Sequence, residues 1–390
     1  MFQLPTAVQT CLQTLRSAGI DAYLVGGCVR DLLLQMTPTD YDITVNVSPA
    51  TVKQLFDRTI DTGLRHGTVT VLQDGMPIEI TQMRKDGLYT DHRRPDIILP
   101  STSLTEDLAR RDFTINAIAL DDSGNLFDPF HGQQDLHRKI LRTVGDPNQR
   151  FNEDALRILR LFRFAAKLRF SIEPNTFRNA LQQTRLLRYI SAERIFAELI
   201  KTVTASEPEQ LTPLLQYGGL SFIGLQYHRP LTPLSALPPR RNPRFAGLLY
   251  LCGADAEQTC SALKTDKKLR RYCGFVLRAL QQPEDHSPYA LKKLMFESDF
   301  STVSDLLCLR AACSGRSDTQ WQQDLRQLRQ SPIYLQDLQI NGAQLKTLGI
   351  RPIAMTPTLR YLMDCVHKDP SCNQEQQLLQ LAQKYNETCD

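Results

Sequence analysis

The chain has 390 residues, of which 42% are hydrophobic and 23% charged, and its formal net charge at pH 7 is +4. This length exceeds a single core of ordinary size and predicts roughly two to four domains, while the composition excludes a largely disordered chain. No apolar run approaches the roughly 20 residues of a membrane span, and "MFQLPTAVQT" lacks the pattern of a signal peptide, so we predict a cytoplasmic protein that does not contact a membrane.

Two kinds of pattern follow each other along the chain. Up to about residue 145, short runs such as "AYLV", "YDITVNV", "GTVTVL" and "PIEITQM" are typical of strands and alternate with a few helical patterns. From "RFNEDALRILRLFRFAAKLRF" onward the pattern is helical almost everywhere, with proline-rich interruptions. We therefore predict an α+β fold, with a mixed sheet and its helices first and an all-α remainder after it.

The first strand pattern ends in a pair of glycines. "AYLV" precedes Gly26 and Gly27, and "CVRDLLL" then has the pattern of a helix that carries Arg30. Such a turn points backbone N–H groups and a guanidinium toward the end of the strand, where they suit a phosphate. A tight strand-to-helix connection without a ligand is the alternative.

Two aspartates open the next strand pattern. Asp40 and Asp42 are two residues apart, so a strand would place both carboxylates on one face. Paired acids resist burial unless a cation lies between them, and paired Mg²⁺ ions occupy such places in phosphoryl-transfer sites. A solvated strand edge is the alternative, but a phosphate-compatible turn just before the pair favours nucleotidyl transfer.

A helix is predicted from about Asn152. Helical steps of 100° place Asp154 beside the apolar side of this helix, and three arginines follow on the adjoining face at a spacing of three: Arg157, Arg160 and Arg163. The alternative is an ordinary helix start, with Asn152 as the N-cap, acidic residues complementing the helix dipole, and arginines on a solvated face.

Several motifs together resemble one enzyme family. They are "LVGGCVRDLLL" with "TDYDIT", then "RRDFTINAIAL", "FDPFHGQQDL", "EDALRILRLFRFAAKL" and "AERIFAEL". In this order, over roughly residues 20 to 200, they closely resemble the class II tRNA nucleotidyltransferases, the family of CCA-adding enzymes. "LQINGAQLKTLGI" is similar to the tail of the bacterial members, although many of them have Gly-Pro where this chain has "IRPIAMTP".

The resemblance implies a polymerase beta-like nucleotidyltransferase head followed by an all-α neck, body and tail. The implied boundaries are 1–146 for the head, 147–205 for a neck that recognises the base, 206–295 for the body, and 296–390 for a tail that binds tRNA. The implied reaction is template-independent addition and repair of the 3′-terminal CCA of tRNA from CTP and ATP, with Mg²⁺ as cofactor and release of pyrophosphate. Whether the protein forms a homodimer is left open.

The resemblance also implies roles for single residues. Asp40 and Asp42 would hold Mg²⁺, while Gly27, Arg30 and Arg111 would hold the triphosphate. Glu79, in "PIEITQM", is a conceivable third carboxylate by its strand position, but the family pattern depends on two and we do not include it.

Further along the chain, Asp112 and Asn116 would approach the ribose, although an aspartate at that place could equally cap a helix. Arg160 and Arg163 would support the phosphate or the base.

The pair of Asp154 and Arg157 would select the base. Cytosine and adenine both present an amino donor beside a ring-nitrogen acceptor, whereas uracil and guanine present the reverse. A carboxylate beside a guanidinium matches the first pattern, and with the second it would leave polar groups unpaired at about 1–3 kcal/mol each. Protein side chains could therefore replace a template.

Two charged segments remain. The polar segment at 84–96 resembles the flexible loop that enzymes adding the terminal A retain and C-only enzymes lack, so it favours complete CCA synthesis or addition of A alone. The basic run "KTDKKLRR", with "PPRRNPR" before it, is either a contact for the tRNA backbone or a solvated helix face. The alternatives to a CCA-adding enzyme are an A-adding enzyme, a poly(A) polymerase, and a non-catalytic RNA-binding protein on a degenerate nucleotidyltransferase fold. The presence of both Asp40 and Asp42 argues against the last.

Overall fold

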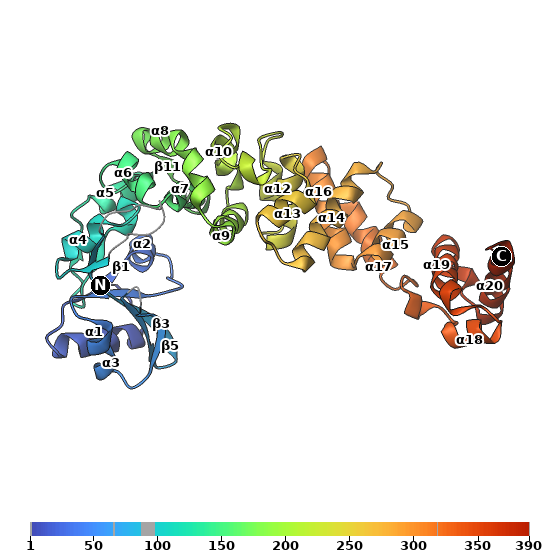
Figure 1. The fold of residues 1–390 in the computed structure, drawn as a ribbon, viewed down its shortest axis with the longest axis horizontal. Helices are drawn as coiled ribbons and strands as arrows, with labels where there is room; N and C mark the ends of the chain where they lie inside the picture. Colours follow the sequence, from blue (N-terminus) through green and yellow to red (C-terminus); the bar gives the residue numbers. More distant parts are fainter. Residues whose placement is uncertain (1, 65–66, 87–97, 318, 390) are drawn as a thin grey trace. The chain divides into compact units, whose positions relative to one another are not determined.

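The computed structural model describes residues 2–64, 67–86, 98–317 and 319–389. It forms two compact units, the first comprising residues 1–227 with 262–264 and the second the remaining residues (Figure 1). The predicted division into head, neck, body and tail is finer than these two units and stays a prediction. Within the described ranges, no helix combines the length and the apolar character that a membrane crossing requires.

A seven-stranded mixed sheet forms the first part of the first unit. The order of its strands is β3-β4-β5-β2-β1-β8-β9. Strands β2 and β5 run parallel, and the other neighbours run antiparallel. The strands are β1 (Ala22–Val25), β2 (Asp42–Val45), β3 (Thr59–Gly63), β4 (Thr68–Gln73), β5 (Met76–Gln82), β8 (Ala119–Leu120) and β9 (Leu126–Phe127).

Two short two-stranded ladders accompany this sheet. Strand β6 (Arg84–Asp86) pairs with β7 (Ile98–Pro100), and β10 (Ile140–Leu141) pairs with β11 (Ser171–Ile172). The mixed sheet predicted for the N-terminal part is confirmed.

Alternating burial explains why these runs form strands. Ile78 and Ile80 of β5 are buried, whereas Glu79 between them is exposed. Helices α1 (Thr6–Ser17) and α3 (Pro49–Leu55) contact each other and strand β4, and Figure 1 shows them on one side of the sheet. Helix α2 (Gly27–Leu33) directly follows β1 and contacts it.

The rest of the first unit is largely helical. Its helices are α4 (Leu104–Ala109), α5 (Gly132–Arg138), α6 (Pro147–Glu153), α7 (Leu156–Leu168), α8 (Pro174–Gln182), α9 (Ala192–Val203) and α10 (Thr212–Gln216). Helix α7 buries one side, which includes Ile158, Leu161 and Ala165, and it packs against α9.

The single helix predicted from Asn152 is wrong. Helix α6 ends at Glu153, Asp154 has extended backbone angles (φ −139°, ψ 102°), and α7 begins at Leu156. The backbone N–H of Leu156 donates to Asp154 Oδ1 at 3.1 Å, which is the local side-chain bond by which aspartate competes with the helix ladder. Asp146, not Asn152, is the N-cap, and it belongs to α6.

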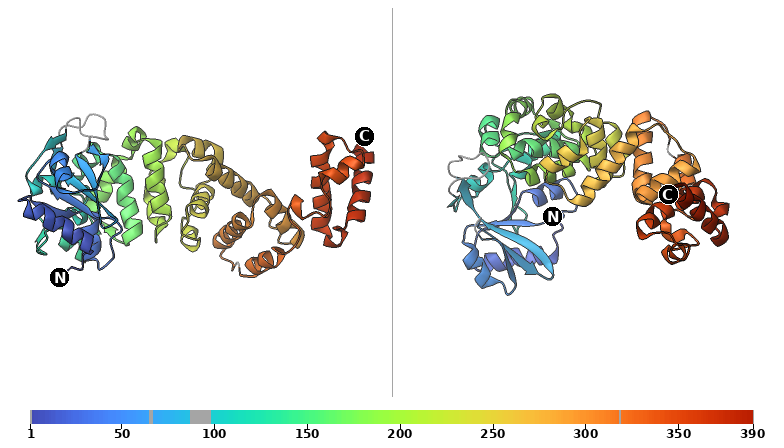
Figure 2. Two further views of the ribbon diagram at one scale, coloured as in Figure 1. Left: turned by 90° about the horizontal axis from the view of Figure 1, so that it is seen from below. Right: turned by 45° about the vertical axis from the view of Figure 1, so that its right-hand side comes forward.

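Helices make up the described part of the second unit, which confirms the predicted all-α remainder (Figure 2). They are α11 (Pro233–Ala236), α12 (Arg241–Leu251), α13 (Ala256–Ala262), α14 (Lys267–Gln281), α15 (Pro288–Glu297), α16 (Phe300–Ser314), α17 (Thr319–Leu328), α18 (Gly342–Thr347), α19 (Pro352–Lys368) and α20 (Glu375–Cys389). One apolar cluster gathers around Leu291 and Leu307, and another around Leu345 and Leu362.

Candidate active site

A polar cavity of about 460 Å³ lies in the first unit where α2, the start of β2 and α7 meet. Its lining contains eight arginine or lysine and five aspartate side chains, and this excess of cations suits a polyanionic ligand. The site residues predicted from the sequence all line it: Gly27, Arg30, Asp40, Asp42, Arg111, Asp154, Arg157, Arg160 and Arg163. Asp112 and Asn116 line it as well, whereas Glu79 does not.

Of the two glycines after β1, Gly26 has the stricter requirement for a missing side chain. Its φ is +78°, and a Cβ there would lie 2.8 Å from Arg111 Nη1. A Cβ on Gly27 would make only ordinary contact with Arg30 Nη2, at 3.6 Å. Gly27 was the glycine predicted to hold the triphosphate, whereas Gly26 is the one that lets Arg111 approach the turn.

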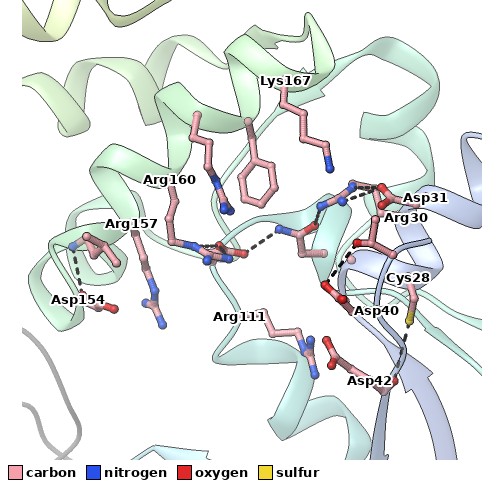
Figure 3. A pocket seen from close by; sticks show the side chains of 18 of the residues that line it. Cys28, Arg30, Asp31, Asp40, Asp42, Arg111, Asp154, Arg157, Arg160 and Lys167 are labelled. Atoms are coloured by element: carbon pink, nitrogen blue, oxygen red, sulfur yellow. Dashed lines mark hydrogen bonds and ion pairs between the residues drawn. The ribbon is translucent and has the colours of Figure 1, made fainter. Parts of the chain in front are cut away.

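The two carboxylates expected to share a strand face differ in backbone position. Asp42 is the first residue of β2, where it pairs in register with Glu79 of β5, and Asp40 lies before the strand. The placement of both on one strand was therefore wrong for Asp40. Both side chains nevertheless line the cavity, and Figure 3 shows Asp42 facing Arg111.

The Asp42 carboxylate lacks sufficient positive charge around it. Burial raises its pKa to about 6, the negative charges of Glu79 and Asp40 act in the same direction, and Arg111 opposes them. Arg111 is shared, because its Nη2 also lies 3.1 Å from Oδ2 of Asp107, which is fully buried. An additional cation would relieve the repulsion between the carboxylates.

The donor chemistry at Asp40 and Asp42 fits Mg²⁺. This ion prefers oxygen ligands and is commonly held by one or two carboxylates together with substrate phosphates and water. Across the described ranges, no three or more His, Cys, Asp or Glu side chains gather in a way that could hold a metal. The two carboxylates would therefore leave the remaining coordination positions to phosphate oxygens and water.

Asp112 forms the centre of a buried network. It accepts hydrogen bonds from Arg160 Nε at 2.7 Å and from Asn116 Nδ2 at 3.0 Å. Burial alone would raise the pKa of Asp112, but Arg160 and Asn116 outweigh it and lower the pKa to about 2. Arg30 Nη1 donates to Asn116 Oδ1 at 2.8 Å, and Arg30 Nε donates to Asp31 Oδ1 at 2.8 Å. The network thus fixes Arg30 and Arg160 at the cavity wall.

An aromatic ring lies beneath the cations of this wall. The guanidinium carbons of Arg30, Arg160 and Arg163 lie 5.2, 5.4 and 4.3 Å from the centroid of Phe164. Arg163 Nε also lies 3.0 Å from Glu198 Oε2 of α9. Phe164 could not be identified from the sequence, because a phenylalanine on a buried helix face has the ordinary pattern of a core residue.

Arg194 of α9 holds Asp154 at the helix break. Its Nη2 donates to Asp154 Oδ2 at 2.8 Å, while the backbone N–H of Leu156 occupies Oδ1. Each carboxylate oxygen accepts more than one hydrogen bond, so Asp154 keeps acceptor capacity toward the cavity. "AERIFAEL" was among the quoted motifs, but the sequence analysis assigned no role to Arg194.

The Arg157 guanidinium is partly committed to the protein. Its Nη1 donates to Glu153 Oε2 at 2.7 Å and to the carbonyl of Arg150 at 3.0 Å, and its Nη2 donates to the carbonyl of Arg110 at 2.8 Å. Of its five N–H groups, Nε–H and one Nη2–H have no acceptor among the described residues. They are the donors that a ligand in the cavity could use.

Figure 3 separates the cavity into two ends. Asp40 and Asp42 lie at one end, Asp154 and Arg157 lie at the other, and Arg160 lies between them. Of the segment 84–96, residues 84–86 form β6, and residues 87–96 lie outside the described residues. The basic run at 264–271 does not line this cavity.

The chain is similar to known proteins over nearly its whole length. A model of the poly A polymerase head domain matches residues 22–142, and one for the probable RNA and SrmB-binding site of polymerase A matches residues 169–223. A CCA-adding enzyme from Limosilactobacillus fermentum is 37% identical over 95% of this chain and 94% of its own. One from Geobacillus stearothermophilus is 36% identical over 85% and 84%.

Solved structures agree with these matches. The crystal structure of the Bacillus stearothermophilus CCA-adding enzyme in complex with CTP matches with a TM-score of 0.86 and 30% identity, covering 99% of each chain. The Thermotoga maritima CCA-adding enzyme complexed with tRNA matches with a TM-score of 0.69 and 20% identity, over 97% of this chain and 95% of its own, which supports the fold alone.

Proposed function

This chain belongs to the family of CCA-adding enzymes, which are tRNA nucleotidyltransferases, and we propose that it performs their reaction in the cavity between β2 and α7. In this proposal it adds the 3′-terminal CCA to tRNA from CTP and ATP without a nucleic-acid template. The observation that supports the location is that the residues predicted for metal, triphosphate and base all line this one cavity.

The end of the cavity at Asp40 and Asp42 would hold the reacting groups. Mg²⁺ held by these two carboxylates would neutralise charge on the triphosphate and promote ionisation of the 3′-hydroxyl of the RNA. Arg30 and Arg111 bind phosphate oxygens, and the missing side chain of Gly26 leaves room for Arg111. The 3′-oxygen forms a bond to the α-phosphorus while the bond to the β-phosphate oxygen breaks, so pyrophosphate leaves without a covalent enzyme intermediate.

The other end of the cavity would choose the base. Asp154 accepts from the amino group of cytosine or adenine, and Nε–H or the remaining Nη2–H of Arg157 donates to the ring nitrogen. Arg194 keeps the Asp154 carboxylate in place through the 2.8 Å hydrogen bond, and Glu153 does the same for the Arg157 guanidinium. Because the contacts come from fixed side chains, no template strand is needed.

The cellular setting follows from the substrates. We place the protein in the cytoplasm, with tRNA, CTP and ATP as its partners. A homodimer is tested by measuring the molar mass in solution with light scattering.

The test of this function uses a tRNA transcript that lacks its 3′ end. It is incubated with the protein and CTP, ATP or both, and the products are sequenced. We expect two C residues with CTP alone and complete CCA only with both nucleotides. Addition of A alone, or of a run of A residues, would identify an A-adding enzyme or a poly(A) polymerase, and binding without any incorporation would identify the non-catalytic alternative.

A further inference from the structure

A second cavity, of about 720 Å³, lies within the second unit. The N-terminal ends of α12 and α16 and one face of α14 line it. Five cationic side chains contribute to the lining: Arg240, Arg241, Lys268, Arg271 and Arg278. Four of them come from the two basic segments that the proposed reaction leaves without a role, and Arg278 lies further along α14.

These five cations fall into two groups. Arg240 donates to Asp305, and Arg241 Nη1 donates to Asp266 Oδ2 at 2.9 Å. Lys268, Arg271 and Arg278 are exposed, and none of them has an ion pair or side-chain hydrogen bond with any residue that the structure describes. Arg240 and Arg241 therefore use their charge in contacts within the unit, whereas the charges of the other three cations are available to a ligand.

The open cations form a row along α14. At 100° per residue, Lys268, Arg271 and Arg278 lie within about 80° of one another around the helix axis. The ten helical steps from Lys268 to Arg278 span about 15 Å, a length over which one strand of a nucleic-acid duplex carries about four phosphates. Arg278 Nη1 lies 3.3 Å from the place where Gly274 would carry a Cβ, so this guanidinium lies back along the helix.

The carboxylates of the same cavity do not neutralise the row. Asp305 accepts from Arg240 and, at 2.9 Å, from the hydroxyl of Tyr272. Asp299 caps α16 by accepting from the backbone N–H of Thr302 at 2.9 Å. Asp305 and Asp299 therefore use their charges within the protein. Glu297, the third carboxylate of the lining, is exposed and has no ion pair with Lys268, Arg271 or Arg278 in the described structure, so the row keeps an excess of positive charge.

We propose that Lys268, Arg271 and Arg278 bind backbone phosphates along one strand of the RNA substrate, whereas Arg240 and Arg241 serve the fold. An extended row suits a polyanion of regular spacing better than a single phosphate or carboxylate. The proposal rests on the proposed function for the identity of that polyanion, a tRNA.

The experiment measures RNA binding without nucleotides. Fluorescence anisotropy gives the Kd of a labelled tRNA transcript lacking its CCA, at several NaCl concentrations, for the wild type and for the triple variant Lys268→Met, Arg271→Met and Arg278→Met. Removal of three phosphate contacts should raise Kd about tenfold or more and reduce the slope of log Kd against log[NaCl] by about three. The KM for CTP should not change.

Arg270→Met is the matched control. Arg270 lies on the same helix but pairs with Glu257 at 3.0 Å and does not line the cavity. Its loss removes one positive charge, as each substitution of the triple variant does, and should change the slope by well under one, against about one for each substitution in the row. An equal effect of the control, or an unchanged slope in the triple variant, overturns the proposal.

Two further measurements separate loss of RNA binding from unfolding, and the binding row from the proposed reaction. If the triple variant melts below the wild type, Arg278→Met alone is used, and a slope reduced by about one is expected. A wild type that binds tRNA with the expected salt dependence but incorporates no nucleotide would refute the proposed function and leave the binding row standing.

Discussion

Two aspartates of the same cavity, the half-buried Asp42 and the buried Asp112, have opposite electrostatic environments. Burial raises the pKa of Asp42 to about 6, with Glu79 and Asp40 adding to the effect. Asp112 is also buried, yet Arg160 and Asn116 overcome the effect of burial and lower its pKa to about 2. The difference shows where the protein compensates a carboxylate with its own side chains and where it leaves that charge for a ligand.

The two environments correspond to two tasks. Asp112 uses its charge to hold Arg160 and Asn116, so it acts through other residues of the wall. Asp42 has Arg111 as its opposing charge, and Arg111 is shared with Asp107. We therefore expect substitution of Asp42 to remove activity without harming the fold, and substitution of Asp112 to harm the fold first.

The largest effect is expected for Asp42→Asn. Loss of a carboxylate that holds the cation at the reacting phosphate should lower the rate of CMP incorporation by about a thousandfold or more. The melting temperature should stay equal or rise, because a poorly compensated buried charge is removed. Radiolabelled incorporation and thermal melting measure the two quantities.

Glu79→Gln is the control for Asp42→Asn. Glu79 pairs in register with Asp42 but is exposed and does not line the cavity. Its substitution should leave most of the activity. A comparable loss in both variants would mean that Glu79 belongs to the metal site after all.

The second effect concerns stability. Asp112→Asn leaves Arg160 without its partner in a buried network, and this should lower the free energy of unfolding by about 3 kcal/mol. Urea denaturation followed by circular dichroism measures it. The comparison variant is Asp122→Asn, which removes the partner of the exposed Arg16 and should leave the free energy of unfolding nearly unchanged. Equal midpoints for Asp112→Asn and the wild type would contradict the structural role of this network.

The third effect concerns base choice. Asp154→Ala removes the acceptor for the amino group and the group that repels the carbonyl of uracil. Discrimination of CTP over UTP, measured as the ratio of kcat/KM values, should drop by about ten- to a hundredfold. Arg194→Met should have a smaller effect, because Asp154 then keeps its bond from the Leu156 N–H. If both variants keep full rate and discrimination, the base is selected elsewhere.

The sheet and the site residues were accessible from the sequence for different reasons. Alternating hydrophobic runs predicted strands, because one face of each strand packs against helices. The site residues came mainly from motif spacing, and Asp40, Asp42 and Arg111 indeed line one cavity although they are distant along the chain. Their roles remain predictions that the experiments above test.

Tertiary contacts explain what the sequence did not reveal. Helical periodicity ran through Asp154 without interruption, whereas the structure breaks the helix there, with Asp154 bonded to the Leu156 N–H and to Arg194 of another helix. The requirement at Gly26 arises from its φ of +78°, and a side chain there would also displace the guanidinium of Arg111, a distant residue that no local pattern contains. Local signals predict elements well where packing agrees with them and fail where a distant partner decides the conformation.

The smallest effect is a pH dependence that separates the two aspartates. Because the pKa of Asp42 is raised to about 6 in the folded protein, the folded state binds a proton more readily than the unfolded state, and stability rises as the pH falls from 7 to 5. Asp112, with its pKa lowered to about 2, is ionised throughout this window and loses its stabilising effect only as the pH falls below about 4. Urea denaturation in EDTA at pH 7, 6 and 5 should therefore show the wild type gaining about 1 kcal/mol relative to Asp42→Asn. The difference between the wild type and Asp112→Asn should stay constant over the same range. If the difference in unfolding free energy between the wild type and each variant changed equally with pH, the contrast between Asp42 and Asp112 would be refuted.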